Sequence, residues 1–365
     1  MTSKISTEMN LNKKNFEEIK LWLNNFQSVY EFNSSYYTKK EKQETLGYKN
    51  NRICRFCGKA KPETTFNNKA HVLPAFMGNT HVKSNYECDE CNLKFGKYEN
   101  DLASFIGLRR FYFSNSSFEK SRKRVFKLKN SNAEIYRSIR GIEVIDPKNE
   151  IFEKLEDWKL QRCKINKTPF VPLNVYKSFV KIVLSLLSEE ALIQFRKICN
   201  FLITDELDSD KMTLRYAKLS IHEIKDFHFE NPIVFTFSKV KKLNEYEKKN
   251  NVLIPDKTFI IYFYQFCIQV YLPFDVKDKD AFNREKILFY LFPPILIEPI
   301  DKTIMTIYSN YYHSFRDMSS KVKITNEKDE FFIKDLIDPI LKEYTEEEHN
   351  EMIRMYDLRK IKKYK

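Results

Sequence analysis

Four cysteines in two close pairs are the residues of this sequence whose spacing most clearly indicates chemistry. Cys54 and Cys57 form one pair, Cys88 and Cys91 form the other, and 30 residues separate the pairs. Each Cys-x2-Cys pair can supply two thiolates to one tetrahedral zinc ion. The alternative is four unrelated buried cysteines, which explains the spacing poorly because only three other cysteines occur in 365 residues. Four protein ligands close the coordination shell, so the sequence predicts a structural zinc ion.

A histidine lies in the segment between the two pairs. His71 belongs to the stretch KAHVLPAFMGN, residues 69–79, and precedes Pro74 by three positions. It could be a buried core residue, a zinc ligand or a catalytic base. A histidine beside valine and leucine is usually a core residue, but an imidazole with an ordinary pKa near 6.5 also suits a base at neutral pH. Because zinc would hold both ends of this segment, it is the place to look for a catalytic site.

A helix is predicted from about residue 92, directly after the second cysteine pair. Large apolar residues form its core stripe, namely Phe95, Tyr98, Leu102, Phe105 and Ile106. A neighbouring stripe carries Asn92, Gly96, Glu99 and Ala103. Asn and Glu oxygens are hard ligands suited to Mg²⁺ or Mn²⁺, and the glycine leaves room for a backbone or a phosphate. Asp101 lies on the far side of the helix, so Glu99 is the stronger candidate ligand.

Basic residues outnumber acidic ones and give a formal net charge of +13, which favours polyanionic partners without identifying one. For any single lysine, a solvated surface position is the simpler interpretation. No glycine-rich phosphate loop of the Walker or dinucleotide-binding type is present. Residues 51–110, which contain both cysteine pairs, are called the cysteine segment. Five cations of this segment could hold the phosphates that flank a reacting group: Lys69, Lys94, Lys97, Arg109 and Arg110.

The rest of the sequence predicts both helices and strands. A helix at 15–30 precedes a polar linker that reaches residue 50, and two helices occupy 171–202, the second starting at Ser188. A strand pattern begins at about 123, and the region after about 116 is predicted to be an α+β domain of its own. It includes a hairpin over 130–133, strands near 233–240, 258–272, 287–298 and 302–309, and a C-terminal helix over 331–362.

No part of the sequence predicts secretion or a membrane span. The longest apolar run, residues 259–274, contains two glutamines, and the first 15 residues lack the apolar core of a signal peptide. Paired cysteines of this kind suit metal binding in a reducing compartment better than disulfides. We therefore expect a soluble, cytoplasmic protein.

A strand ending in His-x-x-Pro, a second strand and a CxxCN sequence that opens a helix together resemble an HNH endonuclease. The similarity covers residues 51–110 and points to a zinc-stapled subgroup of bacterial HNH proteins, often found in phage-defence settings. The resemblance implies a ββα-metal module and metal-dependent hydrolysis of phosphodiester bonds. It implies that His71 is the general base, that Asn92 faces the catalytic ion, and that Asn85 corresponds to the central asparagine of the family.

The sequence departs from this family pattern at Ala70. Many relatives have Asp, Glu or His there as a metal ligand, and alanine cannot bind a metal ion. Either Glu99 replaces that ligand, so that Asn92 and Glu99 share Mg²⁺ or Mn²⁺, or the site has lost its activity. The alternative function is therefore a non-catalytic zinc module that binds nucleic acid or a protein partner.

These observations divide the chain into three expected parts. Residues 1–48 are an N-terminal helical segment and linker, 49–112 are an HNH nuclease domain with the four-cysteine zinc site, and 113–365 are a larger α+β domain that senses, regulates, oligomerises or binds substrate. We expect a metal-dependent endonuclease that acts on double-stranded DNA, plausibly in phage defence. A second copy of the chain or a partner defence protein could accompany it, and no membrane partner is expected.

Overall fold

The computed structural model describes most of the chain in ranges separated by gaps: 13–37, 44–79, 81–110, 124–127, 134–138, 141–145, 152–154, 160–204, 211–224, 229–272, 286–297, 305–307, 311–334 and 353–355. Packing divides the chain into two compact units, each made from two separate pieces of sequence. The first comprises Met1–Leu102 and Val171–Val322, and the second comprises Ala103–Phe170 and Lys323–Lys365. The boundaries after residues 48 and 112 remain a prediction.

A six-stranded antiparallel sheet, in the order β1-β11-β13-β14-β10-β18, is the largest element of the first unit. Its strands are β1 (Tyr30–Tyr37), β10 (Lys218–Ile224), β11 (Phe229–Lys239), β13 (Lys257–Tyr264), β14 (Phe266–Leu272) and β18 (Tyr311–Asp317). The apolar run near 258–272 is therefore two strands, which turn at Gln265. Nearly every residue of these two strands is buried, as expected where both faces of a sheet are covered.

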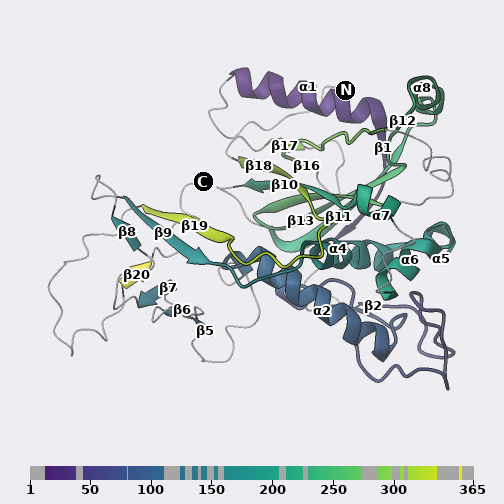
Figure 1. Ribbon diagram of the computed structural model, residues 1–365, viewed down its shortest axis with the longest axis horizontal. Helices are drawn as coiled ribbons and strands as arrows, with labels where there is room; N and C mark the ends of the chain where they lie inside the picture. Colours follow the sequence, from purple (N-terminus) through teal and green to yellow (C-terminus); the bar gives the residue numbers. More distant parts are fainter. Residues whose placement is uncertain are drawn as a thin grey trace. The chain divides into compact units, whose positions relative to one another are not determined.

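Helices cover both faces of this sheet (Figure 1). α1 (Lys13–Val29) lies on one face, where the ring of Phe26 contacts that of Phe237. α4 (Pro172–Leu186) lies on the other face, where Phe179 contacts Phe263. Nearly all of α4 is buried, including two lysines, so this helix must also be covered on the side away from the sheet.

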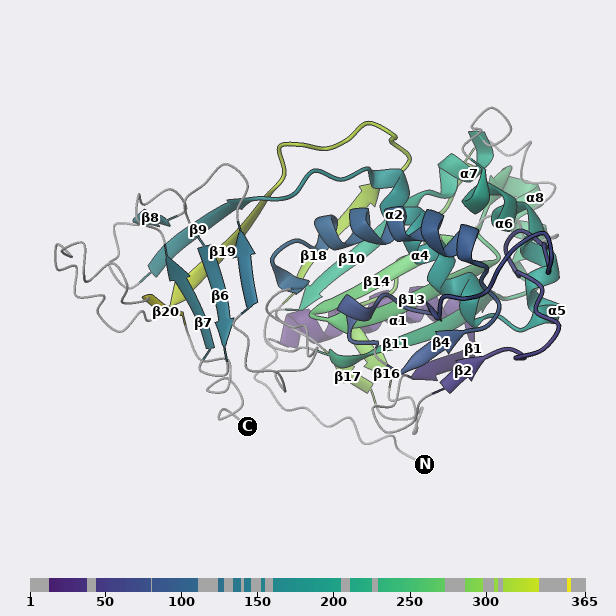
Figure 2. The same cartoon turned by 90° about the horizontal axis from the view of Figure 1, so that it is seen from below.

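The cysteine segment provides that cover. β4 (Val82–Ser84) is the middle strand of a small sheet, antiparallel to β3 (Ala70–His71) and parallel to β2 (Glu44–Leu46). A 3-10 turn, η1 (Ala75–Met77), joins β3 to β4. α2 (Asp89–Ile106) follows and runs beside α4 (Figure 2). Two short strands and the part of α2 that belongs to the first unit thus pack on α4.

The other elements of the first unit are short. The side chain of Ser188 accepts a hydrogen bond from the amide of Ala191, which confirms the predicted start of the second helix. Strand β12 pairs with β15, and β16 pairs with β17. The elements are α5 (Glu189–Leu192), η2 (Ile193–Phe195), α6 (Arg196–Ile203), α7 (Lys211–Tyr216), α8 (Leu243–Asn250), β12 (Val252–Leu253), β15 (Lys286–Ile287), β16 (Ile295–Ile297) and β17 (Met305–Ile307).

The second unit contains two small sheets, in the orders β19-β9-β8 and β20-β7-β6-β5. The carboxylate of Asp329, in β19, accepts from the amide of Leu108 at 2.8 Å and pairs with Arg109 at 2.7 Å. Gly107 precedes these residues with a φ of +64°, and any side chain there would meet that carboxylate. The strands are β5 (Arg124–Lys127), β6 (Glu134–Ser138), β7 (Gly141–Ile145), β8 (Phe152–Lys154), β9 (Leu160–Asn166), β19 (Lys328–Lys334) and β20 (Ile353–Met355).

Several predicted elements can be compared with the structure. The α+β class is confirmed, α1 is the predicted N-terminal helix, and β5 with β6 forms the predicted hairpin. The linker prediction is wrong where the chain forms β1 and β2, because an edge strand tolerates polar residues. The C-terminal helix prediction is wrong at 331–334 and 353–355, which pair as strands, and the remainder of that range lies outside the described residues. Within the described part of the chain, no helix is long and apolar enough to span a membrane.

Candidate active site and zinc site

The four cysteines predicted to bind zinc come together at one point of the first unit. Their sulfur atoms all lie within 4.8 Å of one another, and the Sγ atoms of Cys57 and Cys88 are 3.7 Å apart. A tetrahedron with Zn–S bonds of about 2.3 Å has edges of about 3.8 Å, so the cluster fits a zinc ion. Cys54, Cys88 and Cys91 are buried and Cys57 is half-buried. Four sulfur ligands leave no position for a substrate, so the ion that fits is structural.

Asp89 joins the start of α2 to the chain that leads into His71. Its carboxylate accepts hydrogen bonds from the backbone amides of Asn67 and Asn68, at 2.9 and 2.8 Å, and from the hydroxyl of Thr65. A carboxylate in the first turn also interacts favourably with the positive end of the helix dipole. The zinc cluster and this carboxylate together fix β3 relative to α2.

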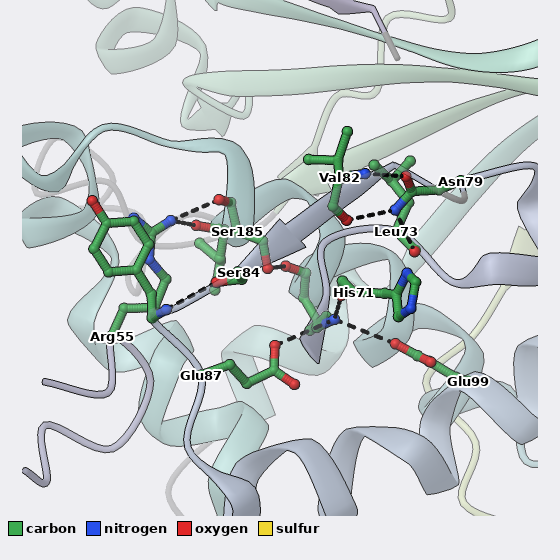
Figure 3. A network of polar contacts seen from close by, with 12 residues as sticks. Arg55, His71, Leu73, Asn79, Val82, Ser84, Glu87, Glu99 and Ser185 are labelled. Atoms are coloured by element: carbon green, nitrogen blue, oxygen red, sulfur yellow. Dashed lines mark hydrogen bonds and ion pairs between the residues drawn. The ribbon is translucent and has the colours of Figure 1, made fainter. Parts of the chain in front are cut away.

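His71 lies in a hairpin whose loop is closed by a buried asparagine (Figure 3). His71 pairs with Lys83 across β3 and β4. The side chain of Asn79 donates to the carbonyls of Leu73 and Val82, both at 2.9 Å, and accepts from the amide of Val82 at 2.9 Å. Asn79 was not among the predicted site residues, although its position directly after Gly78 in a short loop is typical of a turn asparagine.

Lys181 of α4 reaches into the same place from outside the cysteine segment. Its ammonium donates to the main-chain carbonyl of His71 at 2.5 Å and lies 3.3 Å from a carboxylate oxygen of Glu99. A carboxylate oxygen of Glu87 is 3.4 Å away on another side (Figure 3). The side chains of Lys181 and Glu87 are 1% and 0% exposed, whereas that of Glu99 is 26% exposed. Glu99 is therefore the one carboxylate of this group that solvent reaches.

The charges around His71 favour its neutral form. Burial lowers the pKa of His71, the nearby charges of Lys83 and Lys181 lower it further, and Glu99 opposes them. Burial opposes the charge on Lys181, but Glu87 and Glu99 outweigh this effect and raise the pKa of its ammonium. Burial also raises the pKa of Glu87 to about 7, while Lys181 acts in the opposite direction. At neutral pH the group thus combines an uncharged imidazole with a charged ammonium.

The face of α2 next to Glu99 is open. Apart from the two chain neighbours and the backbone of α2 itself, no atom of the described residues lies within 4 Å of the position that a Cβ at Gly96 would take. Asn92 is half-buried in the first turn of the helix, and its backbone amide donates to the carbonyl of Cys88 at 2.9 Å. Asn92, Gly96 and Glu99 lie along one stripe, so a substrate can approach the backbone between the two polar side chains.

The other predicted site residues have different surroundings. Asn85 follows β4, and its side chain donates to the carbonyl of Gly47 at 3.3 Å, which ties β4 to the chain after β2. Lys94 donates to the carbonyl of Ile203 at the end of α6, and Arg109 pairs with Asp329. The contacts of these two cations give no support to a phosphate-binding role. Arg110 is half-buried, whereas Lys69 and Lys97 are exposed.

Two residues of the cysteine segment hold the ends of α4. Asp101 accepts from the amide of Val171 at 3.1 Å and from the side chain of Asn174 at 2.7 Å, at the helix start. The buried guanidinium of Arg55 donates to the carbonyls of Leu184 and Ser185, both at 2.8 Å, at the helix end. A carboxylate at the N-terminus and a cation at the C-terminus both suit the helix dipole.

No role in the site was predicted for α4. One signal was available, because Lys177 and Lys181 interrupt the otherwise apolar stretch FVKIVLSLL and its preceding turn. Lysines are almost never fully buried unless they have a partner. Two lysines lie one helical turn apart on this helix, which has no polar face. They indicate that a neighbouring element supplies carboxylates or carbonyls to pair with them.

The structure thus combines a four-cysteine cluster that fits a zinc ion with a histidine, a lysine and two carboxylates that lie close together. Comparison with protein families gives a more particular result: residues 54–103 match the family model described as HNH endonuclease. This segment of the chain is thus similar to HNH endonucleases, and the similarity suggests a nuclease, which would act on nucleic acid. No curated protein and no solved structure matches the chain.

Proposed function

We propose that this protein is a metal-dependent endonuclease in which β3, β4 and α2 form a ββα-metal module within residues 49–112. The observation that carries the proposal is the position of His71. The half-buried imidazole, with a lowered pKa, lies near the partly exposed Glu99 and next to an open stretch of helix, inside a segment that fits zinc. A base, a hard oxygen ligand and room for a phosphate are what hydrolysis of a phosphodiester bond requires.

His71 takes the proton from the attacking water. A neutral imidazole can accept a proton, and the lowered pKa keeps it neutral at physiological pH. Nδ1 of His71 is buried and has no hydrogen-bond partner among the described residues. A water molecule that reaches the ring therefore contacts Nε2. Asn79 and Asn85 support the hairpin that holds this ring.

Glu99 and Asn92 are the residues that would hold Mg²⁺ or Mn²⁺. The ion would neutralise charge on the phosphate and on the leaving oxygen. Apart from the four cysteines, no cluster of three His, Cys, Asp or Glu ligands occurs in the described ranges, so two side chains and several waters suit the site. The two residues are seven positions apart, about 10.5 Å along the helix, and a helical side chain leans toward the N-terminus. Glu99 would therefore be the direct ligand, and Asn92 would complete the site directly or through water.

Double-stranded DNA is the proposed substrate, and phage defence is the proposed setting. The net charge of +13 favours nucleic acid, and exposed Lys69 and Lys97, with Lys83 beside His71, can contact flanking phosphates. The second unit and the large sheet would bind substrate, sense a trigger or join a second copy or partner defence protein in the cytoplasm. Ala70 supports the alternative of a non-catalytic module, because it removes one acidic ligand.

A plasmid-nicking assay separates these functions. We expect the full-length protein to nick plasmid DNA when Mg²⁺ or Mn²⁺ is added and to lose activity when EDTA is added. His71→Ala should lower cleavage by at least about 100-fold and leave binding of DNA and Mn²⁺ nearly unchanged, because only the base is lost. DNA binding without nicking by the wild-type protein would favour the non-catalytic module. RNA cleavage without DNA cleavage would change the substrate and leave the mechanism in place.

A further inference from the structure

The ammonium of Lys181 is a cation already present at the proposed metal-binding residue. It lies 3.3 Å from Glu99 and donates to the main chain of His71, and it comes from a helix about 80 residues beyond the family match, which ends at 103. Ala70 is buried on the same short strand as His71 and supplies no charge. The strand that carries the proposed base is thus held by an ammonium from α4.

Glu87 balances the charge of Lys181 without taking part in the open site. Glu87 is buried, and neither of its carboxylate oxygens has a hydrogen-bond partner of normal geometry in the described part of the chain. Its one ion-pair contact there is with Lys181 at 3.4 Å. An uncompensated ammonium or carboxylate at such depth would be costly. The pair with Glu87 allows Lys181 to stay inside, and the remaining contact, with Glu99, is the one that faces the site.

We propose that Lys181 is a positioning residue of the nuclease site, which orients His71 through its main chain and shares the Glu99 carboxylate with the divalent ion. The inference rests on the proposed function. Two cations that share one carboxylate oppose each other's binding, so Lys181 weakens the affinity for the metal ion while it fixes the geometry of the base. Its ammonium is too buried to contact substrate, so its effect passes through His71 and Glu99.

The double variant Lys181→Met/Glu87→Gln tests this proposal in the full-length protein. At a pH where Glu87 is ionised, it removes one positive and one negative charge, so the local net charge is unchanged and no fully buried charge loses its partner. We expect Mn²⁺, measured by the EPR signal of the free ion without nucleic acid, to bind about three- to fivefold tighter. We expect kcat at saturating Mn²⁺ to fall about tenfold or more, because His71 loses its main-chain support.

Lys177→Met is the matched control. Lys177 is also buried on α4, one turn earlier, and its ammonium contacts the carbonyl of Thr204 and the rings of Tyr98 and Phe201. The Lys177→Met substitution should lower the free energy of unfolding without changing the affinity for Mn²⁺. Adding Glu99→Gln to the double variant should abolish the gain in affinity, because the shared carboxylate is then gone.

Each result decides the question. If the Mn²⁺ affinity and the kcat of the double variant lie within twofold of the wild-type values, Lys181 has only a packing role and the proposal is wrong. If the double variant does not fold, Glu87→Gln alone should weaken Mn²⁺ binding, and unchanged binding would overturn the proposal. A wild-type protein that binds no Mn²⁺ would overturn it as well. If the double variant binds Mn²⁺ more tightly but the wild-type protein cleaves no DNA, the proposed role of Lys181 at Glu99 would stand. The proposed nuclease function would then be wrong.

Discussion

His71 has two neighbouring cations, and one of them can be removed without disturbing the interior. Lys83 is half-buried opposite His71, and its charge lowers the pKa of the imidazole. A base works in its neutral form, so activity should persist below pH 6.5 and fall as pH drops through the lowered pKa. Lys83→Met should raise this pKa and shift the acid limb of kcat/KM toward higher pH.

The control for this pH prediction is Lys69→Met. Lys69 is exposed and precedes the same strand, so its removal should lower substrate affinity at all pH values without moving the acid limb. If both variants shift the limb equally, long-range charge rather than the cross-strand neighbour sets the pKa of His71. An acid limb above pH 6.5 in the wild-type protein would contradict the direction of the shift.

Glu99 and Glu90 allow a matched comparison on one helix. Glu99→Gln should lower Mn²⁺ affinity, because an amide is a weaker ligand for a hard cation, and raised Mn²⁺ should restore part of the cleavage. Glu90→Gln should leave both unchanged, because Glu90 is exposed and its contact is a surface pair with Lys59. Metal titration of the cleavage rate would show the difference, and equal effects of the two substitutions would remove Glu99 from the site.

Asp101 cannot serve as an inert control in that series. It lies away from the site, as its helical position predicted, but it holds the first turn of α4. Any substitution there acts on the helix that carries Lys181. At the scale of single residues, sequence spacing therefore identified which side chains share a stripe. It could not show which distant backbone each of them contacts.

At the scale of elements, α4 depends on the cysteine segment for both of its ends. Arg55 is buried inside the first cysteine pair, donates to three carbonyls at the end of α4, and stacks 4.2 Å from the ring of Tyr86. Arg55→Met leaves those carbonyls without donors, and we expect a loss of about 2–4 kcal/mol in the free energy of unfolding. Urea denaturation would measure it.

Lys59→Met is the comparison for Arg55, because it removes an exposed cation from the same turn. We expect no measurable change in its urea midpoint, since surface ion pairs contribute little. A similar midpoint for Arg55→Met and wild type would mean that water replaces the guanidinium, and that α4 does not rely on the cysteine segment.

Local patterns predicted elements well where the signal was strong. Cysteine spacing, helical periodicity from about residue 92 and the Ser188 cap all have counterparts in the structure, where α2 begins three residues earlier at Asp89. The C-terminal prediction was wrong because pairing of Phe331 and its neighbours with β9 overrides local helical preference. The junction of the cysteine segment with α4 could not be predicted, because it joins residues 70 and 129 positions apart through a backbone amide and a backbone carbonyl, which any sequence would supply.

The whole molecule should depend on its zinc ion. We expect about one zinc per chain, and Cys88→Ser or a strong chelator should unfold the cysteine segment rather than slow the enzyme. Because Arg55 lies between two of the ligands, loss of zinc should also expose α4, and limited proteolysis should then cut near residues 171–187. Well-folded protein that contains no zinc would contradict this prediction.

The separation of His71 and Lys181 along the chain, 110 residues, has a consequence for biosynthesis. A ribosome adds about 5–20 residues each second, so Lys181 is synthesised about 5–20 s after His71. During that interval the zinc cluster can close, since all four cysteines precede residue 92, but the ammonium that orients the base has not yet been made. A nascent chain released before residue 181, by a stop codon or a stalled ribosome, would therefore contain the cysteine segment without a complete proposed active site. If the proposed function holds, synthesis order would leave such truncated products with a histidine that lacks its main-chain support, and so with weaker nuclease activity than the full chain.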